Sequence, residues 1–318
     1  MRIIKSLEEL TPVHPAPIVT IGNFDGVHLG HQNLIRDLVA RAGKIGGTPI
    51  ILTFDPHPLQ VLAPNNAPLQ IQTLRQKLAV IESLGVPLAV VIPFNIQLAQ
   101  ISARDFAVQM LWNRLHFKEI YVGPNFAFGN RRQGSFNLLK EIGEEKGFFA
   151  GKIRQVQFRG SRVSSTAIRQ ALIAGQVGLA RRLLNHPFAL EGTVVRGAGL
   201  GSKLRIPTAN LMTPNELIPR KGVYVTIFKM DGRRYESVTN IGFRPTVSGD
   251  DTSVLSIEPH LLDFKQDLYG KEVTLEFMMR LRDELRFPDQ KTLVSQIHRD
   301  IENARRYFRW LERSKILL

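Results

Sequence analysis

Short apolar runs alternate with longer amphipathic runs through the first half of the chain. The apolar runs read PIVTIG, PIILTF, LAVVIPF and EIYVG, and they are rich in β-branched residues, as strands are. After each run, apolar residues recur at helical spacing, over 32–42, 74–84, 103–115 and 136–145. This alternation is typical of βα units, and the nearly continuous apolar character of the strands indicates burial on both faces. We therefore predict an α/β domain with a parallel sheet between helices.

Two helices without a strand between them lead to the predicted domain boundary. The segment SSTAIRQALIAG has a serine that can cap a helix, apolar residues at helical spacing, and Gly175 as a stop. A second short helix, VGLARRLL, ends before Asn185-His186-Pro187, which breaks the pattern. We place the boundary there and predict two domains, 1–184 and 185–318.

Strands without long helices between them make up most of the second domain. They read FALEGTVVRG, GVYVTIFKM, RRYESVTNIG, TSVLSIE and KEVTLEFMMRLR, and Asp231-Gly232 between the second and third is a strong hairpin signal. Several antiparallel strands at this spacing predict a small antiparallel β-barrel. A C-terminal helix over about 289–311 follows, and its apolar stripe predicts packing on the barrel. The stripe consists of Leu293, Ile297, Ile301, Ala304 and Phe308.

Composition limits the class of protein. The 318 residues are 43% hydrophobic and 22% charged, as in globular proteins with a full core, and no apolar stretch is long enough to cross a membrane. Glu8 and Glu9 interrupt any signal-peptide pattern, so we expect a cytoplasmic protein with no membrane partner. The absence of cysteine excludes thiolate chemistry and disulfides. The net charge of +14 attracts polyanions, but its dispersal favours phosphate-bearing small ligands over nucleic acid.

The segment GNFDGVHLGH, residues 22–31, stands at the predicted junction between the first buried strand and its helix. Such junctions bind phosphate in α/β folds, because free N–H groups and the helix dipole point outward there. Its glycines, Gly22, Gly26 and Gly30, let a ligand approach the backbone. His28 and His31 can project together over that anion, and imidazoles suit a phosphate that gains charge during displacement.

Other interpretations of this segment compete with the phosphate site. An isolated HxxH spacing ordinarily means one core histidine and one surface histidine, and zinc binding is a second alternative. The glycines at a strand-to-helix junction favour the phosphate site over both. The segment lacks the GK[ST] of a Walker loop and the GxGxxG of a dinucleotide-binding turn, which excludes those two sites.

Several motifs in order give the sequence its resemblance to a known family. GNFDGVHLGH resembles the HxGH signature of the nucleotidyltransferase superfamily, and SSTAIR at 164–169 resembles its second signature. Between them stand TFDPHP at 53–58 and GPNFAFGNRRQGS at 123–135, and GTVVRG and PTANL follow. The combination resembles the bacterial bifunctional riboflavin kinases and FAD synthetases over about residues 17–308. The resemblance implies a Rossmann-like nucleotidyltransferase domain followed by a riboflavin kinase barrel.

The resemblance implies that the first domain transfers AMP from ATP to FMN and releases pyrophosphate. His28 and His31 would stabilise charge on the α-phosphate, and Arg169 would hold the departing pyrophosphate. The other ATP-binding residues would be Gly22, Asn23, Phe24, Asp25, Gly30, Ser164, Ser165 and Thr166. The flavin-binding residues would be Phe54, Pro56, Pro58, Asn125, Phe126 and Phe128. For TFDPHP, a rigid loop with its phenylalanine in the core is an equal alternative.

The resemblance implies that the second domain phosphorylates riboflavin with ATP. Thr208 and Asn210 of PTAN would coordinate Mg²⁺ and ATP, since hard cations prefer oxygen ligands. Glu258 would be the general base that takes the proton of the ribityl 5′-hydroxyl. The ATP-binding residues of this domain would be Gly197, Gly199, Gly201 and Lys203. A plain hairpin loop is the alternative for this glycine run.

The chain departs from the family pattern at a few positions. Ser202, Arg205 and Ile206 stand where Arg, Gly and Phe are usual, and Asn125 stands where Asp is usual. Pro259 requires that its strand lie at a sheet edge or that it stand at a strand end, because proline donates no ladder hydrogen bond. The alternatives are a FAD synthetase with a weakened kinase, a nucleotidyltransferase for another phosphorylated substrate, and a basic nucleic-acid-binding protein. The expected ligands are ATP, Mg²⁺, riboflavin, FMN and FAD, and the oligomeric state stays open.

Overall fold

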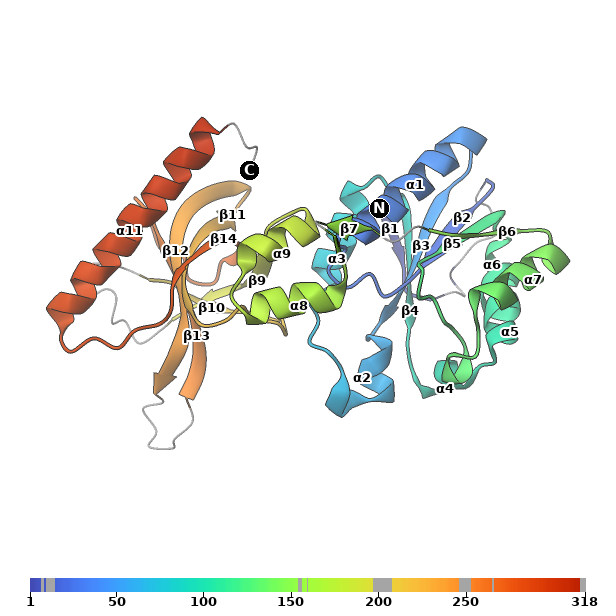
Figure 1. Cartoon of the computed structure of the whole chain (residues 1–318), viewed down its shortest axis with the longest axis horizontal. Coiled ribbons are helices and arrows are strands. Elements are labelled where there is room, and N and C mark those ends of the chain that lie inside the picture. The colour runs from blue at the N-terminus through green and yellow to red at the C-terminus, as the bar shows by residue number, and fades with distance from the viewer. Residues whose placement is uncertain are drawn as a thin grey trace. The chain divides into compact units, whose positions relative to one another are not determined.

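The computed structural model describes residues 1–6, 9, 15–153, 156–158, 160–196, 208–245, 253–264 and 266–314. The chain forms two compact units, Met1–Ser165 and Thr166–Leu318, and each unit has one six-stranded sheet. The first sheet is parallel and covered by helices, whereas the second is an antiparallel, nearly closed barrel with a final helix (Figure 1). This architecture confirms the fold class predicted from the sequence.

Six parallel strands make the sheet of the first unit. In chain order they are β1 (Arg2–Ile4), β2 (Ile18–Ile21), β3 (Pro49–Asp55), β4 (Leu88–Pro93), β5 (Glu119–Val122) and β6 (Phe149–Lys152). Their order across the sheet is β1-β4-β3-β2-β5-β6, and every neighbouring pair runs parallel. The chain proceeds from β2 through β3 to β4 and then returns to the other side of β2. The strand order therefore reverses between β2 and β5, which is where open α/β sheets bind their ligands.

Helices cover both faces of this sheet (Figure 1). In chain order the helical segments are α1 (Leu29–Ile45), α2 (Pro58–Leu62), η2 (Pro64–Asn66), α3 (Leu74–Ser83), α4 (Ile96–Gln100), α5 (Ala103–Asp105), η3 (Phe106–Trp112), α6 (Asn113–Leu115), η4 (Asn130–Arg132) and α7 (Phe136–Lys146). On one face, Leu34 and Leu38 of α1 and Ile81 of α3 pack with Ile18 and Ile51 of the sheet. The four inner strands, β2 to β5, are buried on both sides, as their continuous apolar sequences predict.

The other face of the sheet packs on a helical run that the sequence predicts as one α-helix over 103–115. The structure has three consecutive segments there, α5, the π-helical η3 and α6. Phe106 and Leu111 of η3 lie with Ile142 of α7 in the core cluster of this face. The prediction of one regular α-helix was wrong in the middle segment, because apolar spacing does not distinguish i→i+4 from i→i+5 hydrogen bonds.

The remaining elements are a small ribbon, two helices, the barrel strands and the last helix. They are β7 (Gln157–Phe158), β8 (Ser161–Arg162), α8 (Ser165–Ile173), α9 (Val177–Leu184), β9 (Phe188–Val195), β10 (Asn210–Met212), β11 (Gly222–Met230), β12 (Arg233–Pro245), β13 (Ser253–Leu261), β14 (Glu272–Arg282) and α11 (Gln290–Arg313). Both predicted helices before the boundary are present, and Asn185 follows α9 in the left-handed conformation. The compact units divide after Ser165, and the functional boundary after residue 184 stays a prediction.

The barrel strands follow the order β10-β9-β14-β11-β12-β13, and all neighbouring pairs are antiparallel. The predicted hairpin joins β11 to β12 through Asp231 and Gly232, whose φ angles of 50° and 74° suit a type I′ turn. Pro259 lies in β13 at the end of this order, as its missing N–H requires. The N–H of Ala209 donates to the carbonyl of Pro259 at 2.9 Å, which joins the two ends of the sheet.

The last helix, α11, begins after Asp289, whose side chain caps it, and packs along the outside of the barrel (Figure 1). Ala304, Phe308 and Leu311 are buried there with apolar residues of β11. The predicted stripe therefore packs on the barrel, most closely through its C-terminal half. This helix braces the barrel from outside and leaves its interior to the side chains of the strands.

Candidate active sites

The histidine loop, residues 22–28, connects β2 to α1 at the point where the strand order reverses. It leaves the carboxyl end of β2 and reaches the first turn of α1, where main-chain N–H groups have no partner within the helix. The loop after β5, which contains Asn125 and Phe126, leaves the same edge of the sheet on the other side of the reversal. The predicted phosphate site therefore lies in the crevice typical of nucleotide-binding α/β proteins.

His28 is both the N-cap of α1 and half of a stacked imidazole pair. Its Nδ1 accepts a hydrogen bond from the main-chain N–H of His31 at 3.3 Å, so neutral His28 carries its proton on Nε2. The two rings stack with centroids 3.7 Å apart and an angle of 11° between their planes. A Cβ atom on Gly30 would lie 3.1 Å from Cε1 of His28, which explains the glycine of HLGH.

Both imidazoles are held in the neutral form. Burial, together with the charge of Arg162, lowers the pKa of His28 to about 4. Burial also lowers the pKa of His31 well below its usual value, and the neighbouring His28 and Lys77 lower it further. The Nδ1 atom of His31 is buried and has no hydrogen-bond partner among the described residues. At neutral pH the pair can therefore donate hydrogen bonds to a phosphate without carrying charge itself.

Hydrogen bonds to Asp25 and Asn23 fix the position of the histidine loop. The carboxylate of Asp25, 4% exposed, accepts from the N–H of Ile71 at 2.9 Å. The carbonyl of Asp25 accepts from the hydroxyl of Ser165 at 2.9 Å, and that of Asn23 accepts from the hydroxyl of Thr53 at 3.3 Å. Ser165, the last residue of the first compact unit, thus bonds the start of the predicted second signature to the loop that precedes the histidines.

The predicted flavin-binding residues lie at the end of β3, in the segment from there to the start of α2, and on the loop that follows β5. Phe54 is half-buried and meets Phe94 edge to face at 5.6 Å, whereas Phe126 stacks on Phe128 at 5.1 Å. Phe128 itself is buried in the core. Pro56 follows β3, and Pro58 begins α2.

Asn125 has a partner that the sequence does not indicate. Its amide oxygen accepts hydrogen bonds from both terminal nitrogens of the Arg162 guanidinium on β8. The same cation lies close enough to His28 to lower its pKa. With Asn at 125 the guanidinium keeps its full positive charge beside the imidazole pair, whereas Asp at this position would neutralise it.

Two further residues of this edge escape the sequence analysis. The Lys77 ammonium donates to the carbonyl of Asn23 and to the hydroxyl of Thr53, both at 3.2 Å. Nε2 of His57, in TFDPHP, lies 3.0 Å from the side-chain nitrogen of Asn23. No local pattern singles out a lysine on an amphipathic helix, so Lys77 carries no signal, and His57 stands in a motif discussed above only for its aromatic ring and prolines.

Other predicted ATP-binding residues lie at the start of α8. Ser164 precedes the helix and Ser165 is its first residue, while Thr166 and Arg169 belong to the second compact unit. The roles of Thr166 and Arg169 in pyrophosphate binding stay predictions. Phe24 is buried in the core, and its ring lies 3.3 Å from the position of a Cβ on Gly22, which allows no side chain there without a shift.

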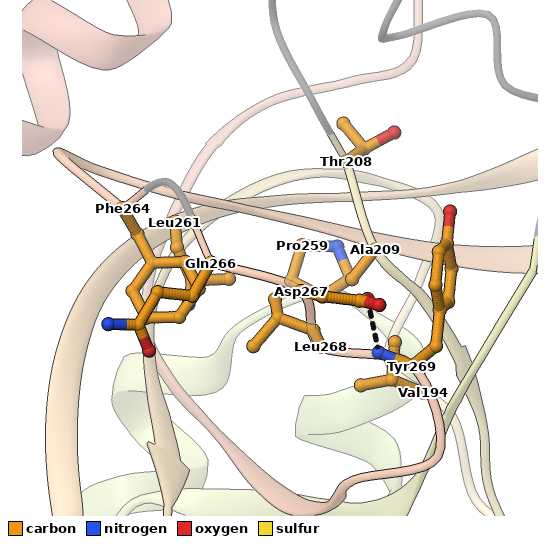
Figure 2. Close-up of a pocket in the computed structure, with 10 residues that line it drawn as sticks. All are labelled: Val194, Thr208, Ala209, Pro259, Leu261, Phe264, Gln266, Asp267, Leu268 and Tyr269. Carbon is orange, nitrogen blue, oxygen red and sulfur yellow. Dashed lines mark hydrogen bonds between the residues drawn. The ribbon is translucent and has the colours of Figure 1, made fainter.

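The barrel contains a pocket of about 330 Å³ near the junction of its two end strands. Its lining is mostly apolar and consists of Val194, Thr208, Ala209, Pro259, Leu261, Phe264, Gln266, Asp267, Leu268 and Tyr269 (Figure 2). Figure 2 shows the Thr208 hydroxyl at one side and the Asp267 carboxylate, which accepts from the N–H of Tyr269 at 2.9 Å. The volume and lining suit a planar heterocycle with a few polar contacts.

The other predicted kinase residues surround this pocket only in part. Asn210 opens β10, two residues after Thr208. Glu258 stands in β13 next to Pro259, and strand alternation directs neighbouring side chains to opposite faces. The hydroxyl of Ser256 donates to the Glu258 carboxylate at 2.8 Å. The remaining predicted and atypical residues, Gly197, Gly199, Gly201, Ser202, Lys203, Arg205 and Ile206, lie outside the described residues.

Comparisons with known proteins bear on both units. Residues 11–167 match the family model of FAD synthetase, and residues 184–308 match that of riboflavin kinase. The bifunctional riboflavin kinase/FMN adenylyltransferase of Pseudomonas fluorescens is 38% identical over 305 residues, 96% of this chain and 97% of its own. The protein of that name from Escherichia coli (strain K12) is 37% identical over 310 residues, 97% of this chain and 98% of its own.

A solved structure is similar over nearly the whole chain. It is described as a macrolide-efflux protein from Streptococcus pneumoniae, and it matches with a TM-score of 0.85 and 28% sequence identity. The match covers 96% of this chain and 98% of that one.

A stacked imidazole pair at the reversal of a parallel sheet, in a unit that matches the FAD synthetase family model, places the first unit in the nucleotidyltransferase class, here joined to a small antiparallel barrel. The sequence matches then indicate that FMN is the acceptor of AMP and that the second reaction is the phosphorylation of riboflavin. The chain belongs to the family of bifunctional riboflavin kinases/FMN adenylyltransferases. It is an enzyme of flavin nucleotide biosynthesis with FAD synthetase and riboflavin kinase regions in that order.

Proposed function

We propose that the two activities of the family occupy separate sites in this chain. AMP transfer from ATP to FMN takes place at the carboxyl edge of the parallel sheet, beside His28 and His31. Phosphorylation of riboflavin takes place at the barrel, beside Thr208 and Glu258. The stacked, neutral imidazole pair at the start of α1 is the observation that carries the first assignment.

For AMP transfer, a phosphate oxygen of FMN attacks the α-phosphorus of ATP as the bond to the β-phosphate breaks and pyrophosphate leaves. No protein nucleophile is needed, so the residues act by positioning and by stabilising charge. His28 donates from Nε2 to an α-phosphate oxygen, and the first N–H groups of α1 add their dipole. Thr166 and Arg169 at the start of α8 hold the leaving pyrophosphate, as phosphate-binding helix starts do.

We assign the binding of FMN, the acceptor of AMP, to the half-buried phenylalanine rings beside the carboxyl edge of the parallel sheet. Phe54 stands at the end of β3 and Phe126 on the loop after β5, and the exposed faces of these half-buried rings suit an isoalloxazine ring. Pro56 and Pro58 shape the first of these loops, and Asn125 holds the second through Arg162. The buried ring of Phe128 supports Phe126 from below by stacking.

For the kinase reaction, Glu258 takes the proton of the ribityl 5′-hydroxyl as that oxygen attacks the γ-phosphate and ADP leaves. The apolar pocket next to Thr208 holds the adenine of ATP. Ser256 fixes the Glu258 carboxylate by its hydrogen bond. Gly197, Gly199, Gly201 and Lys203, which lie outside the described residues, are proposed to bind ATP.

Mg²⁺ fits the donor set of the kinase site. Thr208 and Asn210 offer a hydroxyl and an amide oxygen, which hard cations accept. Among the described residues, no group of three or more histidine, aspartate or glutamate side chains is arranged to hold a metal ion. At Thr208 and Asn210, ATP phosphates and water would complete the coordination. When bound with ATP, the ion would neutralise phosphate charge during transfer.

The test of the AMP-transfer site uses the substitution His28→Asn. Asparagine caps helices well, so the variant keeps the start of α1 while it loses the imidazole. FAD formation from supplied FMN and ATP should fall by on the order of a hundredfold or more. Unchanged turnover would remove the histidine from the mechanism.

The matched control is His116→Asn. His116 is exposed, precedes β5 at the opposite edge of the sheet, and has a φ of 43°, a conformation that asparagine adopts readily. FAD formation in this control should equal that of the original protein. Riboflavin kinase activity, measured on the same preparations, should stay unchanged in both variants.

The cellular setting remains part of the proposal. Among the residues that the structure describes, no helix has the length and apolar character to cross a bilayer. A cytoplasmic enzyme whose partners are the small molecules riboflavin, FMN and ATP, with no nucleic acid, agrees with its composition.

A further inference from the structure

A buried network links the histidine loop to the TFDPHP segment through Lys77 on α3. The Lys77 ammonium donates to the carbonyl of Asn23 and to the hydroxyl of Thr53, each at 3.2 Å. The Thr53 hydroxyl in turn donates to the same carbonyl at 3.3 Å, and Thr53 is fully buried. These three hydrogen bonds form a ring that joins Lys77, Asn23 and Thr53 where β2 and β3 end.

The charges around the Lys77 ammonium come from the same two segments. Burial lowers the pKa of Lys77, while Asp25 of the histidine loop and Asp55 of TFDPHP favour its charged form. His57, also in TFDPHP, contacts the side chain of Asn23 at 3.0 Å. Two independent contacts, one through Lys77 and one through His57, therefore connect the same pair of segments.

The histidine loop needs such support because its backbone is strained. Phe24 and Val27 have φ angles of 49° and 36°, in the left-handed region that bulky residues avoid. Conformations of this kind are unfavourable for such side chains and persist only where the surroundings impose them. The Lys77 network holds the carbonyl directly before Phe24, and the histidine pair follows directly after Val27.

We propose that Lys77 is a positioning residue for AMP transfer, a role that rests on the function proposed above: it fixes the histidine loop against TFDPHP and places a positive charge beside His31. The ammonium acts through the loop and the imidazoles rather than through the reacting atoms. It couples the segment that binds the α-phosphate to the segment assigned to the flavin, so the two substrates meet in one geometry.

The positive charge of Lys77 affects the pKa of His31. The charged and titratable groups that face His31 are His28 on the same helix start and Lys77 on α3, with Asp25 and Asp55 near the ammonium. On the other side of the pair, Arg162 acts on His28. Removal of the Lys77 charge should raise the pKa of His31, because a cation disfavours the protonated imidazole.

The experiment compares Lys77→Met, Lys77→Arg and the control Lys44→Met in the full chain. Methionine keeps the length of the side chain but removes the charge and the donors, while arginine restores both. Lys44 is exposed in the last turn of α1, far along the helix from its histidine end. The measurements are kcat and KM for FAD formation from FMN and ATP, riboflavin kinase activity, and the His31 pKa from NMR titration of histidine-labelled protein.

In Lys77→Met, kcat for FAD formation should fall on the order of tenfold to a hundredfold, with KM for ATP and FMN nearly unchanged. The His31 pKa should rise, and kinase activity should match that of the original protein. Lys77→Arg should restore the His31 pKa and most of the turnover, and Lys44→Met should change neither. Unchanged turnover in Lys77→Met, or a loss with the His31 pKa unmoved, overturns the proposal.

A second variant covers the case in which Lys77→Met does not fold. Thr53→Val removes the bridging hydroxyl and keeps the ammonium, so kcat should fall on the order of fivefold while the His31 pKa stays in place. Unchanged turnover in Thr53→Val overturns the bridging role. If His28→Asn abolishes FAD formation while Lys77→Met and Thr53→Val do not impair it, the inference about Lys77 fails and the proposed function stands.

Discussion

His28 and His31 stack face to face, with 3.7 Å between ring centroids and 11° between ring planes. Two protonated imidazoles in this arrangement would place like charges in contact and away from water, so at most one ring of the pair can carry a positive charge. Each residue type in HLGH thus has a structural role. His28 caps the helix, Gly30 leaves room for the His28 ring, and His31 stacks on that ring.

The stability of the first unit should depend on pH through His28. Its pKa is 6.5 in an unfolded chain and about 4 in the folded protein, so between these values the unfolded chain binds the proton more readily. The free energy of unfolding should therefore fall as pH decreases from about 6.5 towards 4, by on the order of 1–3 kcal/mol. Chemical unfolding followed between pH 7.5 and 5 measures this, and His28→Asn should weaken the dependence. A variant with the same slope as the original protein would contradict the prediction.

Two glycines of α1 should respond in opposite ways to replacement by alanine. A Cβ on Gly30 crowds the His28 ring at 3.1 Å, so Gly30→Ala should lower FAD formation at least severalfold. A Cβ on Gly43 meets nothing within 4 Å, so Gly43→Ala should stabilise the helix by about 0.5–1 kcal/mol without loss of activity. Equal activity of the two variants would refute the steric account of HLGH.

The two reactions should separate in the variant Glu258→Gln. Glutamine keeps the shape of the side chain and removes the base, so FMN formation from riboflavin should fall by on the order of a hundredfold or more. FAD formation from supplied FMN should continue at the original rate. Chromatography of the flavins after incubation with ATP and either substrate distinguishes the cases. A parallel loss of both products would show that the sites are not independent.

The barrel pocket should be blocked by Ala209→Leu. Ala209 lines the pocket, and added methyl groups would occupy part of its 330 Å³. KM for ATP in the kinase reaction should rise at least tenfold, whereas KM for ATP in FAD formation should not change. Met212→Leu, at an exposed site in β10, is the control. An equal KM for ATP in Ala209→Leu and in the control would show that this pocket does not bind the adenine of ATP.

Much of the fold follows from local sequence patterns. The predicted strands PIILTF and GVYVTIFKM lie within β3 and β11, and the helix VGLARRLL coincides with α9. Glycine-rich turns and the Asp231-Gly232 hairpin also stand where their backbone preferences place them. The short strands β1, β6 and β10 were not predicted, because three or four residues carry too little periodicity without their partners.

The sequence by itself determined the class of each domain, most of the longer elements and the histidine pair at a strand-to-helix junction, because those depend on residues close together in the chain. The family resemblance rests on several such local motifs in order. Tertiary structure alone decided that β2 lies at the reversal of the sheet, that Ser165 bonds to Asp25, and that Lys77 joins Asn23 to Thr53. These contacts join segments separated by 140, 54 and 24 positions. Periodicity and turn preferences act over a few residues, whereas such contacts form only when packing closes long loops and buries polar groups that must then find partners.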